Sequence, residues 1–166
     1  MITALNLKYT KTNIVNGALI YTCGDLIASI LLNEFSFTRL FGMVFIGATF
    51  YAIEIPNYFT WIDSKTKHIP GIKKTLAKTG LAIAYFNPLW IARHLFFIAL
   101  FSANYQSIGM NLLKIASLSF LVNIPISFVA NYIIQNKISL SWRFIASAIF
   151  SGLMAIYYAF SEVLFN

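Results

Sequence analysis

Charged residues are scarce in this chain of 166 residues: they make up 10% of it, whereas hydrophobic residues make up 59%. A soluble globular domain carries about 25% charged residues. A domain of this size also keeps too large a surface to bury so many apolar side chains in water. The composition therefore excludes a water-soluble fold and favours an integral membrane protein, and the length suits a single domain over residues 1–166.

Cysteine and histidine are also nearly absent, with one Cys and two His. A single cysteine excludes an internal disulfide, and the apolar neighbours of Cys23 predict a buried position for it. No Cys or His cluster has the spacing of a metal site, and neither a glycine-rich phosphate loop nor a nucleophile elbow occurs. We therefore predict no enzyme activity, no metal and no cofactor.

Acidic residues are few, with five Asp and Glu against twelve Lys and Arg, which gives a net charge of +7. Nucleic acid is not the expected partner, because no Lys and Arg cluster interleaved with aromatic residues lies outside the apolar segments. In a membrane protein, basic residues gather in the loops that stay on the cytoplasmic side. The lipid bilayer is therefore the expected partner of the chain.

Five apolar segments are each long enough to cross a bilayer as a helix, which takes about 20 residues. They cover residues 14–32, 40–62, 79–101, 112–134 and 142–165. Because backbone amides in lipid must bond internally, each segment is predicted to be helical. We predict an all-α, polytopic transmembrane bundle in which Pro56, Pro88 and Pro125 kink three of the spans.

The distribution of basic residues predicts an orientation for five spans. One side of the membrane receives nine of them: Lys8, Lys11, Lys65, Lys67, Lys73, Lys74, Lys78, Lys137 and Arg143. The other side receives only Arg39 and Lys114. The positive-inside rule then predicts that the N-terminus and the loop 63–78 lie on the cytoplasmic or matrix-like side of a bacterial inner membrane or an organellar membrane. The first span is expected to be uncleaved, because it is long for a signal peptide and contains Asp25.

Polar and ionisable side chains interrupt the apolar spans. Because such groups are costly in hydrocarbon, they usually face the bundle interior and mark a solute or ion pathway. The candidates for a pathway are Asp25, Glu54, Asn87, Arg93, His94, Asn123 and Asn131. Arg93 is expected to pair with Glu54 or with Asp25, and His94 is the natural proton carrier. A purely structural ion pair is the alternative interpretation.

Two further polar stripes follow helical spacing. One consists of Ser119, Asn123, Ser127 and Asn131, and the other of Ser147, Ser151, Tyr158 and Glu162. Such stripes either line a polar pathway or hold neighbouring membrane helices together by hydrogen bonds. The spacing does not distinguish between the two.

The chain resembles the family of small peroxisomal and mitochondrial inner-membrane proteins typified by the twenty-two-kilodalton peroxisomal membrane protein. Gly24-Asp25 matches a Gly-Asp pair in the first span of that family. Arg39, Gly47 and the run Tyr58-Phe59…Ile62-Asp63 match the spacing of further family positions, and Pro125 with Asn131-Tyr132 matches a Trp-Pro…Asn-Phe signature. Identities are few, and Ile124 replaces the signature Trp. The family is usually drawn with four spans, and the resemblance implies a channel for small solutes.

A second stretch-by-stretch similarity is to the small bacterial L-alanine exporters. It rests on Phe35-Ser36-Phe37, on residues 85–92 and on Tyr105-Gln106-Ser107-Ile108. Both resemblances imply passage of a small polar solute. We therefore expect a small channel or transporter, which could form a homo-oligomer. The alternative is a non-transporting assembly factor or a small subunit of a larger membrane complex.

Overall fold

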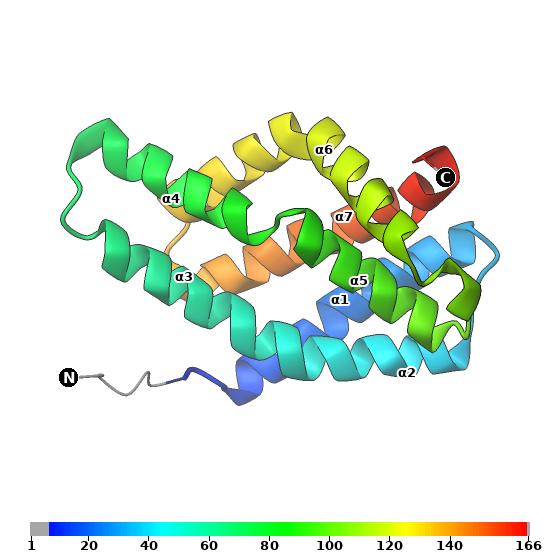
Figure 1. Ribbon diagram of the computed structural model, residues 1–166. Coiled ribbons are helices and arrows are strands. Elements are labelled where there is room, and N and C mark those ends of the chain that lie inside the picture. The colour runs from blue at the N-terminus through cyan, green and yellow to red at the C-terminus, as the bar shows by residue number, and fades with distance from the viewer. Residues whose placement is uncertain (1–6, 166) are drawn as a thin grey trace.

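The computed structural model describes residues 7–165, apart from the side chains of residue 155 and residues 158–165. Every secondary-structure element of this part is helical (Figure 1). The elements are α1 (Lys11–Leu31), α2 (Phe37–Ile46), the π-helix η1 (Gly47–Tyr51), α3 (Ala52–Thr66), α4 (Gly71–Tyr85), α5 (Pro88–Phe101), the 3-10 helix η2 (Tyr105–Ser107), α6 (Met110–Lys137) and α7 (Leu140–Phe165). The predicted all-α bundle is confirmed.

Four helical stretches of the described residues are long and apolar enough to cross a membrane: Lys11–Leu31, Phe37–Thr66, Gly71–Phe101 and Met110–Lys137. They fit an integral membrane protein. The fifth predicted span, residues 142–165, forms helix α7, and its portion Leu140–Met154 is a shorter apolar helix. The predicted polar side chains Tyr158 and Glu162 of α7 lie outside the described side chains.

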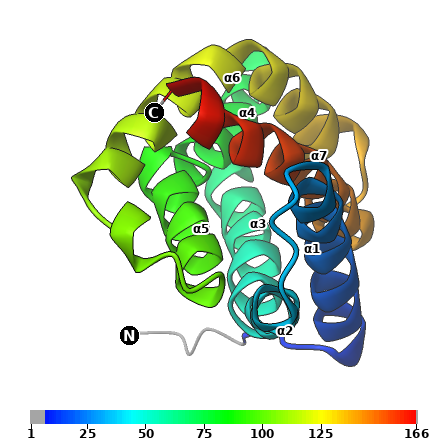
Figure 2. The ribbon, with the colours of Figure 1, turned by 90° about the vertical axis from the view of Figure 1, so that its right-hand side faces the viewer.

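The helices form a ring of five units, in which α2 to α3 and α4 to α5 each make up one unit (Figure 2). Helix α1 packs on the α2–α3 unit, α3 on α4, both α4 and α5 on α6, α6 on α7, and α7 on α1. The start of α1 and the α3–α4 and α6–α7 connections lie toward one end of the bundle, on the left in Figure 1. The loops predicted to share the basic side of the membrane therefore share one end of the fold.

Proline acts differently in the three spans where a kink was predicted. Pro56 and Pro125 lie inside α3 and α6, and α6 bends over the bundle in Figure 1. Pro88 instead opens α5, because the side chain of Asn87 accepts hydrogen bonds from the backbone N–H groups of Leu89 and Trp90 and caps the helix. The span predicted over residues 79–101 is thus two helices, α4 and α5, rather than one kinked helix.

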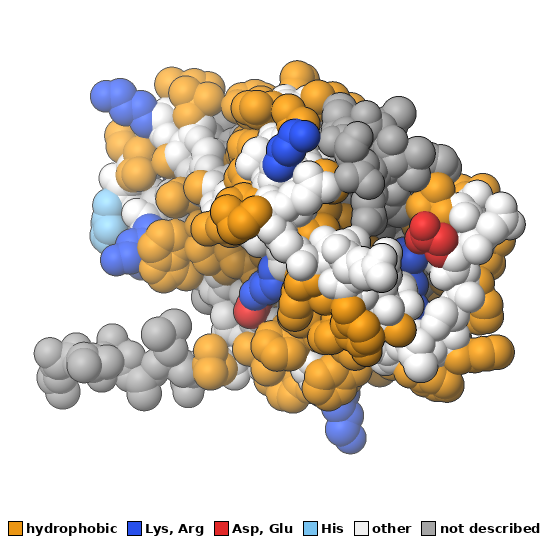
Figure 3. Space-filling model, turned by 45° about the vertical axis from the view of Figure 1, so that its right-hand side comes forward, with side chains coloured by type: hydrophobic (Ala, Val, Ile, Leu, Met, Phe, Trp, Pro, Cys, Tyr) orange, Lys and Arg blue, Asp and Glu red, His pale blue; other side chains and the backbone are white. Residues whose placement is uncertain are grey.

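The outer surface of the bundle is largely apolar. Hydrophobic side chains cover much of the face drawn in Figure 3, and the acidic side chains visible there have a basic side chain beside them. Phe37, Phe41 and Phe45 of α2 are among the exposed large apolar side chains, as a bilayer-embedded surface requires.

Cys23 is also exposed, so the prediction that it is buried is wrong. Its apolar neighbours reflect the lipid-facing composition of α1 rather than a core position.

Small residues allow α1 to approach its neighbours closely. A Cβ atom on Gly24 would lie 2.6 Å from Cα and 2.7 Å from the carbonyl oxygen of Gly152 in α7. A Cβ on Gly17 would overlap the backbone of Gly47 in the π-helix. Close packing of backbones through small residues is the usual way in which membrane helices associate.

We expect Gly24→Ala to destabilise the protein by about 1–3 kcal/mol, because the added methyl group must push α1 away from the α7 backbone. Gly80→Ala is the matched control. Gly80 also lies within a helix, but a Cβ there meets no atom within 4 Å. The control should be neutral or stabilising by roughly 0.5–1 kcal/mol. Unfolding in detergent, followed by circular dichroism, measures the stability of both variants. Equal stabilities would contradict the close approach of α1 to α7.

Candidate functional site

Ion pairing organises the polar side chains within the bundle. The four acidic residues with described side chains, Asp25, Glu34, Glu54 and Asp63, each contact at least one Arg or Lys. Such pairing is expected where water is excluded, since an isolated charge in a low-dielectric medium is far more costly than a paired one. The pairs differ in burial, and that difference separates structural pairs from a candidate site.

Glu54 of α3 and Arg93 of α5 form a two-pronged ion pair. The guanidinium Nη1 donates to Oε1 of Glu54 at 2.9 Å, and Nη2 donates to Oε2 at 2.6 Å. The predicted partnership of these two residues is confirmed. Both side chains are about one-third exposed, 33% for Arg93 and 32% for Glu54. Glu54 precedes the end of α3 at Thr66 by a helical distance of about 18 Å, so the pair lies deep within the candidate span.

A hollow of about 380 Å³ surrounds this pair, between α3, α4 and α5. It is lined by Glu54, Tyr58, Ala84, Tyr85, Asn87, Leu89, Trp90 and Arg93. The hydroxyl of Tyr85 donates to Oε2 of Glu54 at 2.9 Å, and the ring of Tyr85 stacks on that of Tyr58 with centroids 4.4 Å apart. The carboxylate is therefore held by a guanidinium and a phenol together.

Two buried N–H donors of the hollow have no hydrogen-bond partner among the described residues. They are Nε of Arg93 and the indole Nε1 of Trp90. A buried donor without an acceptor is unfavourable, because it has lost its bonds to water. Both belong to side chains that line the hollow, so a polar molecule in the hollow is a natural source of the missing acceptors.

The remaining predicted pathway residues are distributed over the bundle. Asn87 lines the hollow, but its side-chain oxygen caps α5 and its side-chain nitrogen donates to the carbonyl of Ala84 at 2.9 Å. His94 lies behind the hollow, 2% exposed, with Nδ1 2.9 Å from the hydroxyl of Tyr51 and its ring stacked on Trp90. His94 is thus connected to the site through Tyr51, whose ring also lies 5.9 Å from the guanidinium carbon of Arg93.

Asp25 does not reach the hollow. It forms a buried two-pronged pair with Arg39 of α2, with Nε 2.9 Å from Oδ2 and Nη2 2.8 Å from Oδ1. Asp25 is 2% exposed and Arg39 is 1% exposed. Arg39 was predicted to be a loop cation opposite the basic side, but it lies within α2, and Nη1 also reaches the exposed Glu34 at 3.2 Å. The pair joins α1 to α2.

The polar stripe of α6 is used for packing. Asn123 donates to the hydroxyl oxygen of Ser127 at 3.0 Å and to the sulfur of Met154 in α7 at 3.1 Å. Asn131 donates to the carbonyl of Ser127 at 2.9 Å. Both are buried, and neither lines the hollow around Glu54. Asn123 thus links α6 to α7, as the helix–helix interpretation predicts, whereas the bond of Asn131 lies within α6.

The structure thus brings together Glu54, Arg93 and Asn87, with His94 behind them, and leaves Asp25, Asn123 and Asn131 elsewhere. Sequence reasoning missed Tyr85 and Trp90 as site residues. Aromatic residues are abundant throughout the chain, at 17% of it, so the sequence contains no signal that singles out these two. No known protein family, curated protein or solved structure matches this chain.

We expect Arg39→Met to destabilise the protein by about 3–5 kcal/mol, because it leaves the carboxylate of Asp25 buried without its cation. The double variant Asp25→Leu/Arg39→Met removes both charges and should recover much of this loss. Lys114→Met, at the same end of the bundle and exposed, is the neutral control. Unfolding in detergent measures these variants together with Asp25→Leu alone, and strictly additive effects of the two single changes in the double variant would contradict a coupled pair.

Proposed function

We propose that this protein is a small channel or transporter that passes a small polar solute through the membrane, with the hollow around Glu54 and Arg93 as the place where the solute binds. The observation that carries the proposal is an ion pair one-third open to its surroundings, deep within two candidate membrane spans. In hydrocarbon, partly exposed charges are costly. Water or a polar solute in the hollow removes that cost.

The chemistry of the hollow suits a solute with both hydrogen-bond acceptors and donors. Glu54 offers carboxylate oxygens, Tyr85 offers a phenol, and the two unpartnered N–H groups of Arg93 and Trp90 offer donors. Because Glu54 and Arg93 are already paired, the hollow carries no net charge of its own. A small polar molecule that is neutral overall fits this balance better than a multivalent ion.

The two sequence resemblances point to the same class of function. Resemblance to the peroxisomal membrane protein family and to the L-alanine exporters implies solute passage in both cases. The Gly24-Asp25 pair, which carries part of the first resemblance, lies where α1 closely approaches α7. The resemblance supports the class of function and does not identify the solute. We also propose that several copies of the chain assemble into a homo-oligomer and line the passage together.

The alternative is a non-transporting assembly factor or a small subunit of a larger complex. The observation that favours it is the dispersal of the predicted pathway residues. Asp25 is used in a buried pair, Asn123 contacts Met154 of α7, and Asn131 bonds within α6. Under this alternative, a partner helix covers the hollow and supplies the acceptors for Arg93 and Trp90. Stable co-purification with another membrane protein would favour it.

Flux into liposomes containing the purified protein tests the proposal. With a panel of small amino acids, polyols and monovalent ions, we expect at least one solute to pass about tenfold faster than into empty liposomes. Glu54→Gln/Arg93→Gln should abolish this flux, because it removes both charged groups that line the hollow. The double change leaves no unpaired charge, so the fold should be retained. Lys114→Gln, an exposed cation outside the hollow, should transport as the wild type does.

Gel filtration and circular dichroism of each variant establish that it inserts and folds. If the wild-type protein passes no solute of the panel faster than empty liposomes do, the transport proposal is wrong. If the double variant transports normally, transport is real but the hollow around Glu54 is not its path.

Removal of the Tyr85 hydroxyl should weaken solute binding without abolishing flux. Tyr85→Phe keeps the stacked ring but deletes the hydrogen bond to Glu54, which is worth roughly 1.5–3 kcal/mol for a charged acceptor. We expect an increase of about tenfold or more in the solute concentration that gives half-maximal flux. Tyr105→Phe, an exposed tyrosine far from the hollow, is the matched control, and an equal effect of the two changes would argue against a role of the Tyr85 hydroxyl.

A further inference from the structure

A second polar pocket, of about 260 Å³, lies at the end of the bundle that holds the α3–α4 and α6–α7 connections. It is formed between α4, α6 and the start of α7. Four cationic side chains, Lys74, Lys78, Lys137 and Arg143, are among its lining residues; the others are Thr75, Tyr132, Gln135 and Asn136. Such a concentration of positive charge in one pocket is unusual in a chain with 10% charged residues.

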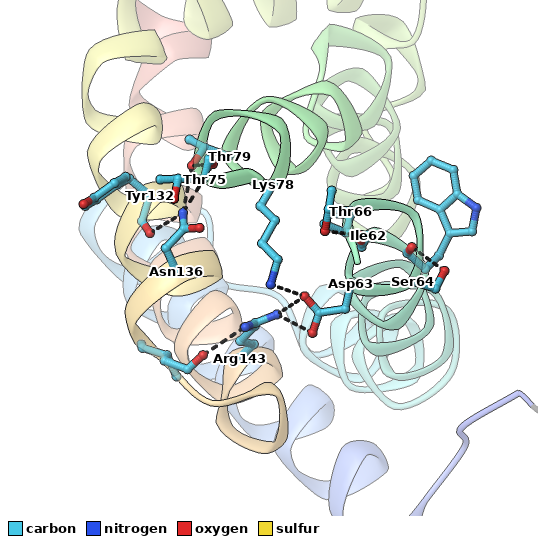
Figure 4. A network of polar contacts seen from close by, with 12 residues as sticks. Ile62, Asp63, Ser64, Thr66, Thr75, Lys78, Thr79, Tyr132, Asn136 and Arg143 are labelled. Carbon is cyan, nitrogen blue, oxygen red and sulfur yellow. Dashed lines mark hydrogen bonds and ion pairs between the residues drawn. The ribbon is translucent and has the colours of Figure 1, made fainter. Parts of the chain in front are cut away.

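One carboxylate, that of Asp63 in α3, is in contact with part of this cluster (Figure 4). Nη1 of Arg143 lies 2.8 Å from both carboxylate oxygens, and Nζ of Lys78 contacts Oδ1. The side chains of Lys78 and Arg143 are 11% and 8% exposed. Asp63 therefore fixes these two cations at the wall of the pocket, but a single negative charge cannot balance four positive ones.

The hydrogen bonds of Asn136 fix the same wall. Its side-chain nitrogen donates to the hydroxyl of Thr79 at 3.1 Å and to the carbonyl of Tyr132 at 3.0 Å, which ties α6 to α4 (Figure 4). The bond to Thr79 fixes α4 and α6, the two helices that carry most of the pocket, relative to one another. A pocket whose walls are already in place lowers the cost of binding.

Three donor groups of the pocket are left for a ligand. Lys74 and Lys137 have no acidic partner among the described residues. Gln135 is completely buried, and neither its amide nitrogen nor its amide oxygen has a hydrogen-bond partner there. A buried amide without partners is unfavourable in itself. The nitrogen of this amide needs an acceptor, and in the lining of a cationic pocket that need points to an anion with acceptor oxygens.

We propose that this pocket binds a phosphate group, held by the amide of Gln135 and the ammonium groups of Lys74 and Lys137. A tetrahedral oxyanion has enough acceptor oxygens to take bonds from all three donors, and charge-assisted bonds of this kind are the strong ones. The pocket lies at the end of the candidate spans, where the headgroups of anionic lipids lie, and basic pockets between membrane helices are typical headgroup sites. Free phosphate is the other source of the same chemistry.

Native mass spectrometry from a neutral detergent tests the lipid source. With equimolar phosphatidylglycerol and phosphatidylcholine, we expect the wild-type protein to retain phosphatidylglycerol preferentially. Lys74→Gln/Lys137→Gln should lower its affinity by about tenfold or more, since each cation near a membrane surface contributes favourably to anionic-lipid binding. The control is Lys65→Gln/Lys73→Gln, which removes the same charge from exposed residues at the same end outside the pocket and should change the affinity less than twofold.

Thermal unfolding with inorganic phosphate, against chloride at equal ionic strength, tests the soluble source. A rise in Tm for the wild-type protein and the control, but not for Lys74→Gln/Lys137→Gln, would assign the pocket to free phosphate. Gln135→Leu, which fills the same space without the amide, should weaken whichever ligand binds. The proposal is overturned if neither ligand binds, or if the pocket variant and its control lose affinity equally. Solute flux is not measured in either experiment, so this outcome is independent of the transport proposal.

Discussion

The cost of an unpaired charge away from water governs the interior of this protein. Each acidic residue with a described side chain has a cationic partner, and the partners come from different helices for Asp25 with Arg39, Glu54 with Arg93, and Asp63 with Lys78 and Arg143. Each pair therefore acts as a fixed link between helices that apolar packing alone would hold less specifically. In a bilayer, where apolar side chains gain little from packing against one another rather than against lipid, such links carry much of the structural specificity.

The three links differ in surroundings, and that difference separates their roles. Asp25 and Arg39 are almost completely buried, so their pair joins α1 to α2 and has no room for a ligand. Glu54 and Arg93 are partly open and lie beside a hollow with unpartnered donors. Asp63 occupies only part of a cationic pocket at the end of the bundle. A similar interaction thus joins two helices at one place and, in our proposals, forms part of a binding site at two others.

Glycine complements this arrangement. Because α1 meets α7 at Gly24 and Gly152, and meets the π-helix at Gly17 and Gly47, its backbone lies close to both neighbours. Asp25, next to Gly24, is buried in the bundle, where the buried guanidinium of Arg39 pairs with it. Gly24 permits the close approach of α1 to α7, and its neighbour Asp25 is buried on the same helix and pairs with Arg39.

The sequence by itself determined the membrane setting, the helical class, the approximate boundaries of four spans, and that Arg93 pairs with an acidic residue of the bundle. These follow from local composition and from the cost of burying charge, which do not depend on how the helices are arranged. Only the tertiary structure decided that Arg93 pairs with Glu54 and Asp25 with Arg39. It also placed Tyr85 and Trp90 beside Asn87 in the lining of the hollow, where Asn87 caps α5 as well. It also decided that Gln135 lines the same pocket as four cationic side chains. These facts depend on which helix faces lie together in the ring. Membrane helices are apolar nearly all round, so their sequences have little hydrophobic periodicity to indicate which face packs against a neighbouring helix.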